Sequence, residues 1–451
     1  MSSAGPVPFL EALRFWLKLG FISFGGPAGQ IAIMHRELVE QRRWISERLF
    51  LQALNYCMML PGPEAQQLAT YIGWLMHRTW GGIAAGALFV LPSLFILIGL
   101  SWIYLAFGHV DWVAGLFYGI KPAVAAIVLQ AVWRIGSRTL KKPSQVPILW
   151  AVAALSFVAI AILKLPFPWV VLAAALTGVV GGRLAPAQFA GGGAHAASGE
   201  GHGPALIDDA TPTPPHALFR RSRLLRVLAV GAALWLVPMG VLVASAGWDH
   251  TLTQMAWFFT KAALLTFGGA YAVLPYVYQG AVEQFQWLTG PQMIDGLALG
   301  ETTPGPLIMV VAFVGFVGGW ARQVLGPDSL FLAGALAATI VTWFTFLPSF
   351  LFILAGGPLV EATHGRIGFT APLTAITAAV VGVIASLALF FLVHVARGEG
   401  AIDLLGQRLD LWGLALAALG LAALLRWKWG VIPVIGACAL AGLVLRLLGL
   451  V

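Results

Sequence analysis

Charged residues and cysteines are scarce in this sequence. Of its 451 residues, 10% are charged and 59% are hydrophobic, whereas roughly a quarter of a soluble domain is charged. That balance excludes a cytosolic enzyme. Two cysteines, Cys57 and Cys438, allow neither a disulfide framework nor a thiolate metal site. Phosphate loops, metalloprotease helices and nucleophile elbows are also missing, so we expect no ATP-driven or hydrolase chemistry, no cofactor and no metal.

The excess of basic residues is small and does not require a nucleic-acid partner. The 26 Lys+Arg residues against 18 Asp+Glu give a net charge of +8, which is typical of basic cytoplasmic loops in a membrane protein. No cleavable signal peptide is expected, because Glu11, Arg14 and Lys18 interrupt the first apolar stretch. The expected partner of most of the surface is therefore the lipid bilayer.

Apolar stretches fill most of the chain. At about 20 residues per crossing, roughly a dozen of them are long enough to span a membrane. They lie near 9–34, 49–76, 82–107, 110–133, 145–164, 166–182, 224–246, 252–276, 291–317, 329–356, 367–395, 409–426 and 430–450. The sequence therefore predicts an all-α integral membrane protein with about 10–13 membrane segments.

The stretch 183–223 differs in composition from the rest of the chain. It is rich in Gly, Ser and Pro and cannot bury enough apolar surface to fold, which predicts a flexible cytoplasmic linker. His195, His202 and His216 lie in it without Cys partners or helical spacing. That pattern favours a solvated linker over a metal site.

The chain contains an internal duplication. An offset of 243 residues (261 minus 18) aligns four motifs without a gap: Lys18 with Lys261, Phe24-Gly25-Gly26 with Phe267-Gly268-Gly269, Trp44 with Trp287, and Pro61-Gly62-Pro63 with Pro304-Gly305-Pro306. Further on, an offset of 256 (347 minus 91) aligns Leu91-Pro92-Ser93 with Leu347-Pro348-Ser349. One insertion of 13 residues (256 minus 243) explains both offsets. We predict a first copy at 9–182 and a second at 252–450.

The second copy is expected to be inverted in the membrane. An extra transmembrane helix at 224–246 places an odd number of segments between the starts of the two copies. Arginines follow the first segment, at Arg36, Arg42, Arg43 and Arg48, whereas the corresponding stretch 277–293 has no Lys or Arg. The positive-inside rule then puts these stretches on opposite sides. Inverted repeats are typical of transporters with a binding site near the membrane midplane.

A simple count of membrane crossings places this Arg-rich stretch on the opposite side of the membrane from the other basic stretches, 134–142 and 220–226. Re-entrant hairpins broken at Gly25-Gly26-Pro27 and Pro61-Gly62-Pro63 would bring all three to the cytoplasmic side. We therefore expect the segments that contain these breaks, and their counterparts in the second copy, to turn back within the membrane.

The breaks themselves predict a binding site. Gly-Gly and Pro-Gly-Pro in the middle of an apolar segment leave backbone groups without helical partners, which is costly unless they line a cavity. Half-helix N-termini at such a cavity suit an anion. A kink or close helix packing is the alternative. Because the breaks recur in both copies, we predict a site formed by Gly25, Gly26, Gly268, Gly269 and the two Pro-Gly-Pro motifs.

A cationic side chain is also needed at such a site. Helix termini contribute about 0.3–2 kcal/mol each, whereas the idealised Born cost of burying a unit charge is about 20 kcal/mol. Glu11, Arg14 and Lys18 share one helical face, and only the lysine is matched in the second copy. Lys18 and Lys261 are thus predicted to form a cation pair at the repeat interface, with Arg14 as a lesser candidate. Snorkelling to the lipid headgroups is the alternative.

Each copy has one acid beside its break. Glu64 follows the first Pro-Gly-Pro directly and Glu301 precedes the second by three residues, so the two positions are not equivalent. Either carboxylate would take up a proton and couple transport to protons, or would neutralise a nearby basic residue. Gln66 and Thr303 are candidates for hydrogen bonds to an oxyanion, or for contacts that only join helices.

At these motifs the chain resembles the CHR family of chromate ion transporters in its long, two-repeat form. In the first copy the resemblance rests on Phe24-Gly25-Gly26-Pro27, the run 29–35, Trp44, Leu60-Pro61-Gly62-Pro63 and 89–92. In the second copy it rests on Phe267-Gly268-Gly269, Leu274-Pro275, Trp287, Asp295-Gly296, Thr303-Pro304-Gly305-Pro306 and 346–350. It implies a multi-pass carrier of the bacterial inner (plasma) membrane that exports chromate and confers chromate resistance, in exchange for sulfate or coupled to protons. A homodimer is left open.

Three positions depart from the family pattern. Ala270 stands where the first copy has Pro27, Gln30 stands where a histidine is expected, and Glu301 stands where a glutamine is expected. These differences bear on which anion is carried more than on membership of the family. Because chromate and sulfate are tetrahedral dianions of similar size, a carrier of sulfate or another inorganic oxyanion is the first alternative.

A membrane-embedded enzyme acting on lipid or cell-wall precursors is the alternative from another class. The histidines outside the linker form no evident catalytic constellation, so we do not expect an enzyme. Trp44 and Trp287 are interpreted as structural residues of the aromatic belt at the membrane interface.

Overall fold

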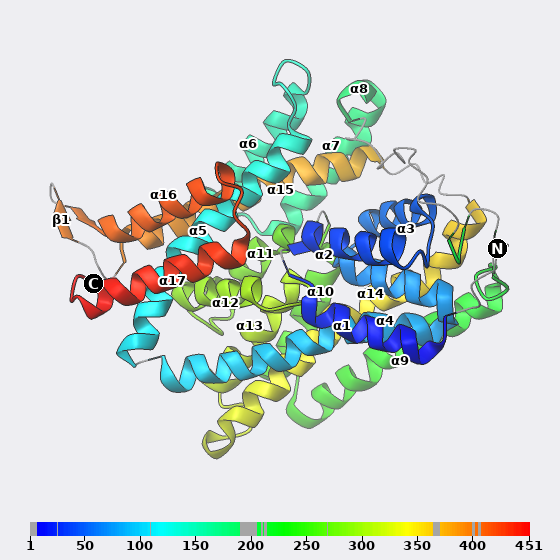
Figure 1. The fold of residues 1–451 in the computed structure, drawn as a ribbon, viewed down its shortest axis with the longest axis horizontal. Coiled ribbons are helices and arrows are strands. Elements are labelled where there is room, and N and C mark those ends of the chain that lie inside the picture. Colours follow the sequence, from blue (N-terminus) through cyan, green and yellow to red (C-terminus); the bar gives the residue numbers. More distant parts are fainter. Residues whose placement is uncertain are drawn as a thin grey trace.

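The computed structural model describes residues 7–24, 26–108, 110–189, 205–208, 211, 214–267, 269–363, 370–398, 402–404 and 407–451. Within these ranges the regular structure is helical apart from two three-residue strands (Figure 1). Six helices are long and apolar enough to cross a membrane, and four shorter apolar helices accompany them. The prediction of an all-α membrane protein is therefore confirmed.

The first copy begins with two hairpins that are broken at their tips. One consists of α1 (Phe9–Ile22), α2 (Gly26–His35) and the π-helix η1 (Arg36–Gln41); the other consists of α3 (Glu47–Met59) and the first part of α4 (Glu64–Phe107). The start of α1 lies beside the end of η1, because Arg42 forms a 3.8 Å ion pair with Glu11 and its guanidinium lies over the Phe15 ring. The chain returns to the end from which it entered, so this segment forms a hairpin and not a straight crossing; its re-entry within the membrane stays a prediction.

α4 also turns back on itself. The backbone is not helical at His77 and Arg78, and the two arms then pack so closely that a Cβ on Gly73 would lie 2.5 Å from the Gly81 carbonyl oxygen. In the second copy the corresponding turn is longer, because α13 (Val310–Ala321) and α14 (Leu330–Thr363) are separated by a loop with the short helix η4 (Pro327–Ser329). This longer turn lies where the sequence comparison places the 13-residue insertion.

The second copy repeats the broken hairpins. Its elements are α10 (Thr251–Leu265), α11 (Ala270–Tyr278), the π-helix η2 (Gln279–Gln284), α12 (Gly290–Thr302), the 3-10 helix η3 (Leu307–Met309) and α13. The two π-helices occupy matching positions, and each is followed at the same interval by a residue with positive φ, Arg43 (53°) and Gln286 (52°). The likeness of the copies therefore extends to backbone irregularities.

The matched tryptophans are buried at the bases of these hairpins. Trp44 is 6% exposed and Trp287 is 2% exposed. Trp44 packs edge-on against Phe15 at 5.1 Å, and Trp287 packs against Phe258, the counterpart of Phe15, at 5.6 Å. The prediction that they anchor at the membrane interface is wrong. In both copies the backbone N–H of the tryptophan donates a 2.8 Å hydrogen bond to a carbonyl of the π-helix. This bond turns the chain and directs the indole ring inward.

The remaining helices complete the two copies and the segment between them. They are α5 (Asp111–Thr139), α6 (Pro147–Ala161), α7 (Phe167–Leu184), α8 (Pro186–Phe189), α9 (Arg221–Ala246), α15 (Thr370–Ala396), α16 (Leu411–Leu425) and α17 (Val431–Leu447), with strands β1 (Ile402–Leu404) and β2 (Gln407–Leu409). α5 packs against α15, α16 and α17. A Cβ on Gly119 of α5 would collide with the Cys438 carbonyl of α17. Close contact through small residues is how helices associate in lipid, where hydrophobic burial gives little advantage.

The linker side of the molecule carries the basic stretches. Ile207 of the linker pairs with Trp44 and Ser46 through backbone hydrogen bonds of 3.1 and 2.9 Å, and Ala217 is completely buried. The Ile148 N–H donates to Gln188 of α8 at 3.2 Å, so the α5–α6 turn lies beside the start of the linker. The described parts of 183–223 are therefore held against the protein. We call the end of the molecule that contains the described linker residues, the α5–α6 turn and the chain around Trp44 the basic side.

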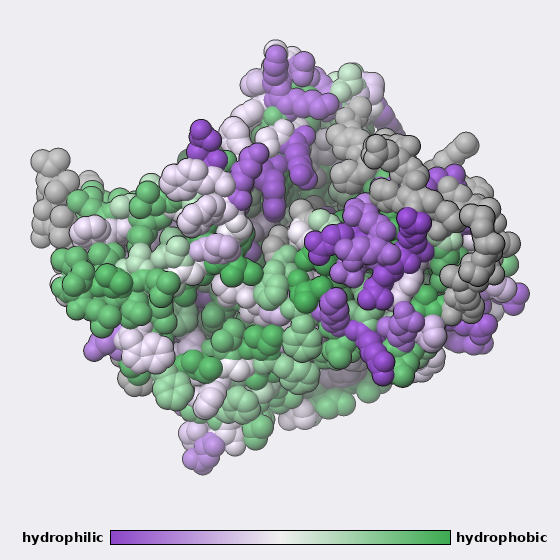
Figure 2. Space-filling view, in the orientation of Figure 1, coloured by the Kyte–Doolittle hydropathy of each residue, from purple (hydrophilic) through white to green (hydrophobic). Residues whose placement is uncertain are grey.

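The surface reflects this arrangement. In Figure 2 hydrophilic residues gather in the upper and right parts of the view, whereas hydrophobic residues dominate the lower left. α9 is the least enclosed of the long apolar helices, with 11% of its most apolar window buried. The helix that sequence analysis placed between the copies thus presents most of its surface to the surroundings, as a lipid-facing segment does.

Candidate functional site

The helix breaks of the two copies are bonded to each other. The Gly62 N–H donates to the Thr266 carbonyl at 2.7 Å, and the Gly305 N–H donates to the Ser23 carbonyl at 2.8 Å. The two bonds are equivalent under the offset of 243 residues (305 minus 62 and 266 minus 23). Each Pro-Gly-Pro motif is thus joined to the chain just before the Gly-Gly break of the other copy. These bonds satisfy part of the backbone that the breaks leave without helical partners.

Only glycine fits at the centre of each Pro-Gly-Pro motif. Gly62 and Gly305 have φ of +125° and +106°, which is strained for any residue with a side chain. A Cβ on Gly62 would collide with the Ser349 hydroxyl, and a Cβ on Gly305 would lie 2.8 Å from the Ser93 Cβ. These serines belong to the matched Leu-Pro-Ser motifs. The Pro-Gly-Pro motif of each copy therefore packs against the Leu-Pro-Ser motif of the other copy.

Four helical segments begin at the breaks. α2 starts at Gly26 (φ +68°) and α11 follows Gly269 (φ +95°), whereas α4 and η3 start directly after Pro63 and Pro306. The first N–H groups of a helix have no acceptor within it and carry a partial positive charge. The breaks therefore leave N–H groups at the starts of four helical segments, and the binding of an anion there stays a prediction. Gly25 and Gly268 lie outside the described residues.

Three buried glutamines line the first copy beside the breaks. Gln30 donates to the Gly305 carbonyl of the other copy, Gln67 donates to the Pro61 carbonyl at 2.8 Å, and Gln66 donates to the next turn of its own helix. The other amide atom of each has no protein partner in the part of the chain that is described. Unpaired buried polar atoms cost about 1–3 kcal/mol each. They are typical of places that take a ligand or water.

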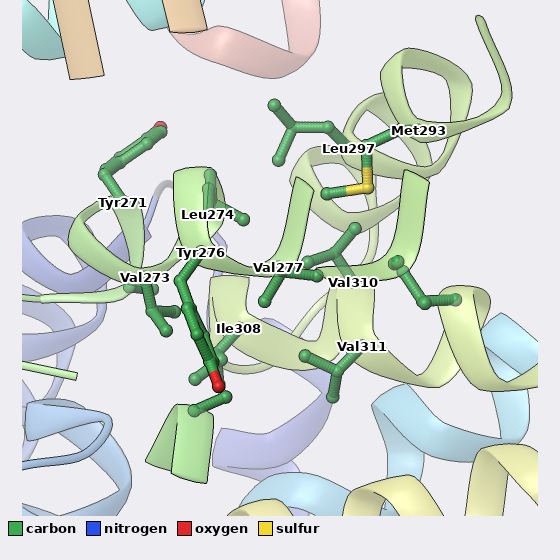
Figure 3. Packing of buried hydrophobic residues seen from close by; sticks show 14 of the residues in the cluster. Tyr271, Val273, Leu274, Tyr276, Val277, Met293, Leu297, Ile308, Val310 and Val311 are labelled. Atoms are coloured by element: carbon green, nitrogen blue, oxygen red, sulfur yellow. The ribbon is translucent and has the colours of Figure 1, made fainter. Parts of the chain in front are cut away.

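The second copy is apolar at the corresponding positions. Leu307, Met309 and Val310 stand where the first copy has Glu64, Gln66 and Gln67 (64, 66 and 67 plus 243). Figure 3 shows Val310 and Val311 packed with other buried hydrophobic residues of this copy. The glutamines beside the breaks therefore come from the first copy, whereas the second copy contributes Glu301 and Ser349.

The two acids occupy different surroundings. Glu64 is half-buried, and a Cβ on Gly269 would lie 4.0 Å from its Oε1, so its carboxylate faces the break of the second copy. Glu301 is 3% exposed and accepts a hydrogen bond from the Tyr271 hydroxyl. The Arg134 guanidinium of α5 is near enough to interact electrostatically with Glu301 and with Tyr271.

Tyr271 and Thr303 complete the surroundings of Glu301. In Figure 3 the side chain of Tyr271 points in the opposite direction from that of Tyr276 on the same helix. The Thr303 hydroxyl donates to the Leu299 carbonyl of its own helix at 2.5 Å. In this structure it therefore serves the helix end rather than a ligand.

The predicted lysines are not brought together. Lys18 and Arg14 are exposed on α1, whose buried face is formed by Ala12, Phe15, Trp16 and Leu19. Lys261 is partly buried on α10, with its ammonium 5.7 Å from the centre of the Trp257 ring. The described contacts include none between the two lysines, because each helix turns aromatic and aliphatic residues inward. Their attraction of an anion remains a prediction.

Two cations and one buried acid were not predicted from the sequence. Arg134 was included in a basic loop, but α5 continues to Thr139. Lys121 is an isolated lysine inside the apolar segment 110–133, a signal that should have marked it. Asp295 is 3% exposed and accepts a 2.9 Å hydrogen bond from the Tyr104 hydroxyl.

Histidine and acidic side chains form no metal centre in the described part of the chain. His216 instead contacts the Trp74 carbonyl through Nε2 at 2.8 Å. His195 and His202 lie outside the described residues.

Broken helices joined between two copies are typical of multi-pass membrane proteins built from internal repeats, a class that includes many transporters. The chromate transporter family model matches residues 10–179 and 253–443. These two regions lie within the two predicted copies, and together they cover most of the chain. The chain therefore belongs to the chromate transporter family.

Relatives with printed names agree with this membership. The chromate transport protein of Pseudomonas aeruginosa is 33% identical over 441 residues, covering 97% of this chain and 92% of that protein. The chromate transport protein of Cupriavidus metallidurans is 29% identical over 437 residues, covering 96% and 92%. No solved structure matches this chain.

Proposed function

We propose that this protein is a secondary transporter that exports chromate across the bacterial inner membrane and thereby confers chromate resistance. The observation that carries the proposal is the pair of equivalent bonds, Gly62 to Thr266 and Gly305 to Ser23, which hold four helix breaks around buried polar side chains. Membership of the family supports chromate as the substrate. The printed names of the relatives describe transport and no enzyme activity.

A dianion at the breaks would be held by several weak donors and by positive charge. Helix N-termini contribute about 0.3–2 kcal/mol each. The Gln66 amide has a second N–H that would donate to the oxyanion, and the amides of Gln30 and Gln67 would do so by giving up contacts of only 3.4 and 3.5 Å. Arg134 supplies positive charge beside Glu301. Lys18 and Lys261 would attract the anion from the exposed faces of α1 and α10.

The two acids would couple transport to protons. Glu64 is partly accessible, whereas Glu301 is enclosed and bonded to Tyr271. Protonation of a carboxylate beside the site lowers the negative charge that a dianion meets there. Exchange for sulfate is the alternative driving force, because sulfate is also a dianion and would bind to the same hydrogen-bond donors.

The positive-inside rule supports a cytoplasmic position for the basic side. The described linker residues and the ends of the first hairpins lie on this side. Export would then run from the basic side to the opposite side.

The test is chromate uptake into inverted membrane vesicles from cells that overproduce the protein. Sulfate, phosphate and molybdate serve as competitors, and a protonophore removes the proton gradient. We expect saturable uptake that sulfate inhibits. Loss of uptake on removal of the gradient would favour proton coupling. A well-inserted protein that gives no uptake would contradict the proposal.

A sulfate carrier is the second candidate. It is favoured by Gln30 and Glu301, which depart from the family pattern at residues that contact the breaks. Uptake of labelled sulfate that chromate inhibits only weakly would support this candidate instead.

A further inference from the structure

Both Gly-Gly breaks have room beside a buried glycine. Gly26 and Gly269 are buried. A Cβ on Gly26 would meet no described atom within 4 Å, and a Cβ on Gly269 would meet only the Glu64 Oε1 atom, at 4.0 Å. Helix packing is much tighter at the buried Gly20, where a Cβ would lie 2.2 Å from the Leu88 carbonyl oxygen. The breaks therefore border space inside the protein that a small ligand could enter.

Gln30 lies beside the first of these breaks. It follows Gly26 by four residues in α2, which places both on the same face of the helix one turn apart. Helical side chains lean toward the N-terminus of their helix, so the amide of Gln30 lies over the turn that begins at Gly26. Its Nε2 atom donates to the Ser23 carbonyl at 3.4 Å and to the Gly305 carbonyl of the second copy. The amide is thus held where the two copies meet.

These two contacts fix which way the Gln30 amide points. A carbonyl oxygen accepts and cannot donate, so the atom that contacts Ser23 and Gly305 has to be the amide nitrogen. The amide oxygen lies on the other branch, where it is buried and has no hydrogen-bond partner among the described residues. If the weaker contact with Ser23 is given up, the bond to Gly305 keeps this orientation. Gln30 therefore presents an acceptor as well as donors.

The other two glutamines beside the breaks show the same pattern. The Gln67 nitrogen donates to the Pro61 carbonyl at 2.8 Å. The Gln66 nitrogen donates to the Thr70 hydroxyl at 3.0 Å, and that hydroxyl uses its own proton on the Gln66 backbone carbonyl at 2.9 Å. Both nitrogens are thereby fixed, and both amide oxygens lack a partner within the described chain. A role in joining helices explains the three nitrogens but not the three oxygens, which lose stability while they stay unpaired.

Unpaired acceptors restrict the protonation state of an oxyanion that binds beside them. A fully deprotonated oxyanion has only acceptor oxygens, so it cannot bond to an amide oxygen. A hydrogen oxyanion has one hydroxyl that can donate to such an oxygen, while its other oxygens still accept from backbone and amide N–H groups.

The charges around the breaks favour the same species. The Glu64 carboxylate faces the space at Gly269, and Arg134 interacts with the carboxylate of Glu301. Lys18 is exposed on the outer face of α1. The Born cost of transfer from water rises with the square of the charge, so it is about four times larger for a dianion than for a monoanion of the same size.

We propose that the site at the breaks binds a hydrogen oxyanion, a monoanion with one hydroxyl, and that the Gln30 amide oxygen accepts the hydrogen bond from this hydroxyl. The inference rests on the proposed oxyanion transport and narrows its substrate to hydrogen chromate. Hydrogen chromate is a weak acid that keeps part of its protons near neutral pH. Hydrogen sulfate is a strong acid, so sulfate carries no proton there. Gln30 thereby separates two anions that size and shape do not separate.

The experiment measures binding and does not depend on transport. Radiolabelled chromate is bound to the purified full-length protein in lipid nanodiscs between pH 7 and pH 9, and is displaced by unlabelled chromate, sulfate or selenate. Selenate is a second tetrahedral oxyanion that carries no proton in this range. The quantity compared is the Kd of sulfate divided by the Kd of total chromate. If chromate binds as the dianion, ionisation of Glu64 or Glu301 affects both anions alike and leaves this ratio constant.

We expect the ratio to fall about tenfold per pH unit above the pH at which hydrogen chromate loses its proton, because only the protonated fraction binds. The ratio for selenate should fall in parallel. A constant ratio would overturn the inference even in a protein that transports chromate. A falling ratio in a protein that gives no uptake would support the inference while contradicting the proposed export. A folded protein that binds no chromate would contradict both.

Variants at Gln30 test the acceptor itself. Gln30→Lys keeps N–H donors for the Ser23 and Gly305 carbonyls but has no acceptor, so the ratio should become independent of pH. Gln30→His has one donor and one acceptor when neutral and should retain the pH dependence. Gln145→Lys makes the same change in the exposed turn between α5 and α6 and should also retain it.

Should Gln30→Lys not insert, Gln30→Met removes the acceptor without adding a charge. The Kd of total chromate at pH 7 should then rise about tenfold relative to that of sulfate, because one hydrogen bond to the hydroxyl is lost. A variant without an acceptor at this position that keeps the ratio of the unaltered protein would overturn the role of Gln30.

Discussion

The two copies share their backbone breaks but differ in the side chains around them. Both have a π-helix, a positive φ, a buried tryptophan and a Pro-Gly-Pro bonded to the other copy. The first copy surrounds its breaks with Gln30, Glu64, Gln66 and Gln67. The second copy has apolar residues at those positions. The comparison indicates that glycine and proline maintain the shape of the site, while side chains of one copy supply most of its polar groups.

The shared glycines should give the largest effects. Gly305→Ala places a Cβ 2.8 Å from the Ser93 Cβ at a φ of +106°. We expect a loss of about 2–4 kcal/mol in the free energy of unfolding, from backbone strain and overpacking, and no chromate uptake. The measurement is the thermal midpoint of the purified protein together with uptake. Gly99→Ala is the control, since a Cβ there meets nothing within 4 Å. Equal stability of the two variants would show that the break tolerates a side chain.

The matched lysines come next. Lys18→Gln should reduce chromate uptake at least roughly tenfold, because it removes a positive charge from a membrane segment that an anion must approach. Lys261→Gln should act in the same direction. Abundance of both variants in the membrane should equal that of the unaltered protein. Unchanged uptake by Lys18→Gln would remove this lysine from the pathway and leave Arg134 as the cation near the breaks.

The two acids test the asymmetry directly. Glu301→Gln should make uptake insensitive to a protonophore and slow it several-fold, because an amide cannot exchange a proton. Glu64→Gln is the companion variant at the non-equivalent position. Tyr271→Phe, which keeps the acid but removes its hydrogen bond, serves as the control. If both glutamine variants keep the response of the unaltered protein to the protonophore, neither acid carries the coupling proton.

Linker docking on the first copy should depend on pH. Burial lowers the pKa of His216 below its usual value of 6.5, although its hydrogen bond to the Trp74 carbonyl acts in the other direction. Arg78 and Arg223 also disfavour its charged form. Because the docked state binds the proton less well than the free state, docking is favoured above pH 6.5 and weakens as the pH falls below it.

Limited proteolysis of the linker at pH 7.5 and 5.5 measures this effect. Cleavage of the unaltered protein should be several-fold faster at the lower pH, relative to an unstructured peptide cut under the same conditions. His216→Gln retains a donor for the Trp74 carbonyl and should lose the pH difference. A pH difference that survives in this variant would assign it to another group.

The smallest effect is expected from substitutions that replace a residue of the first copy by its counterpart in the second. Phe285 occupies in the second copy the position of Arg42, and it stacks on Trp287 at 4.6 Å as the Arg42 guanidinium lies over Trp44 at 5.0 Å. Arg42→Phe combined with Glu37→Gln should change the free energy of unfolding by less than about 1 kcal/mol, because the pair with Glu11 is exposed and no buried carboxylate is left without its cation. A large loss in this double variant would show that the ion pairs with Glu11 and Glu37 hold the hairpin.

The duplication, the breaks and the re-entrant hairpins were all predicted from the sequence. Apolar length, glycine and proline are local signals, because lipid forces each segment to satisfy its own backbone groups. Even the 13-residue insertion is located by the offset of the motifs alone, and the structure shows it as the longer turn between α13 and α14. These features depend on chain order and not on which side chains meet.

Which polar groups meet was decided by the tertiary structure. The sequence selected Lys18 and Lys261 because they are matched, but packing leaves Lys18 on the exposed face of α1 and brings Arg134 from α5 to Glu301. It assigned Trp44 to the membrane interface, whereas the turn after the π-helix buries it. The direction of a side chain depends on the rotation of its helix and on neighbours that are distant in sequence. The hydropathy of the chain carries no information about either.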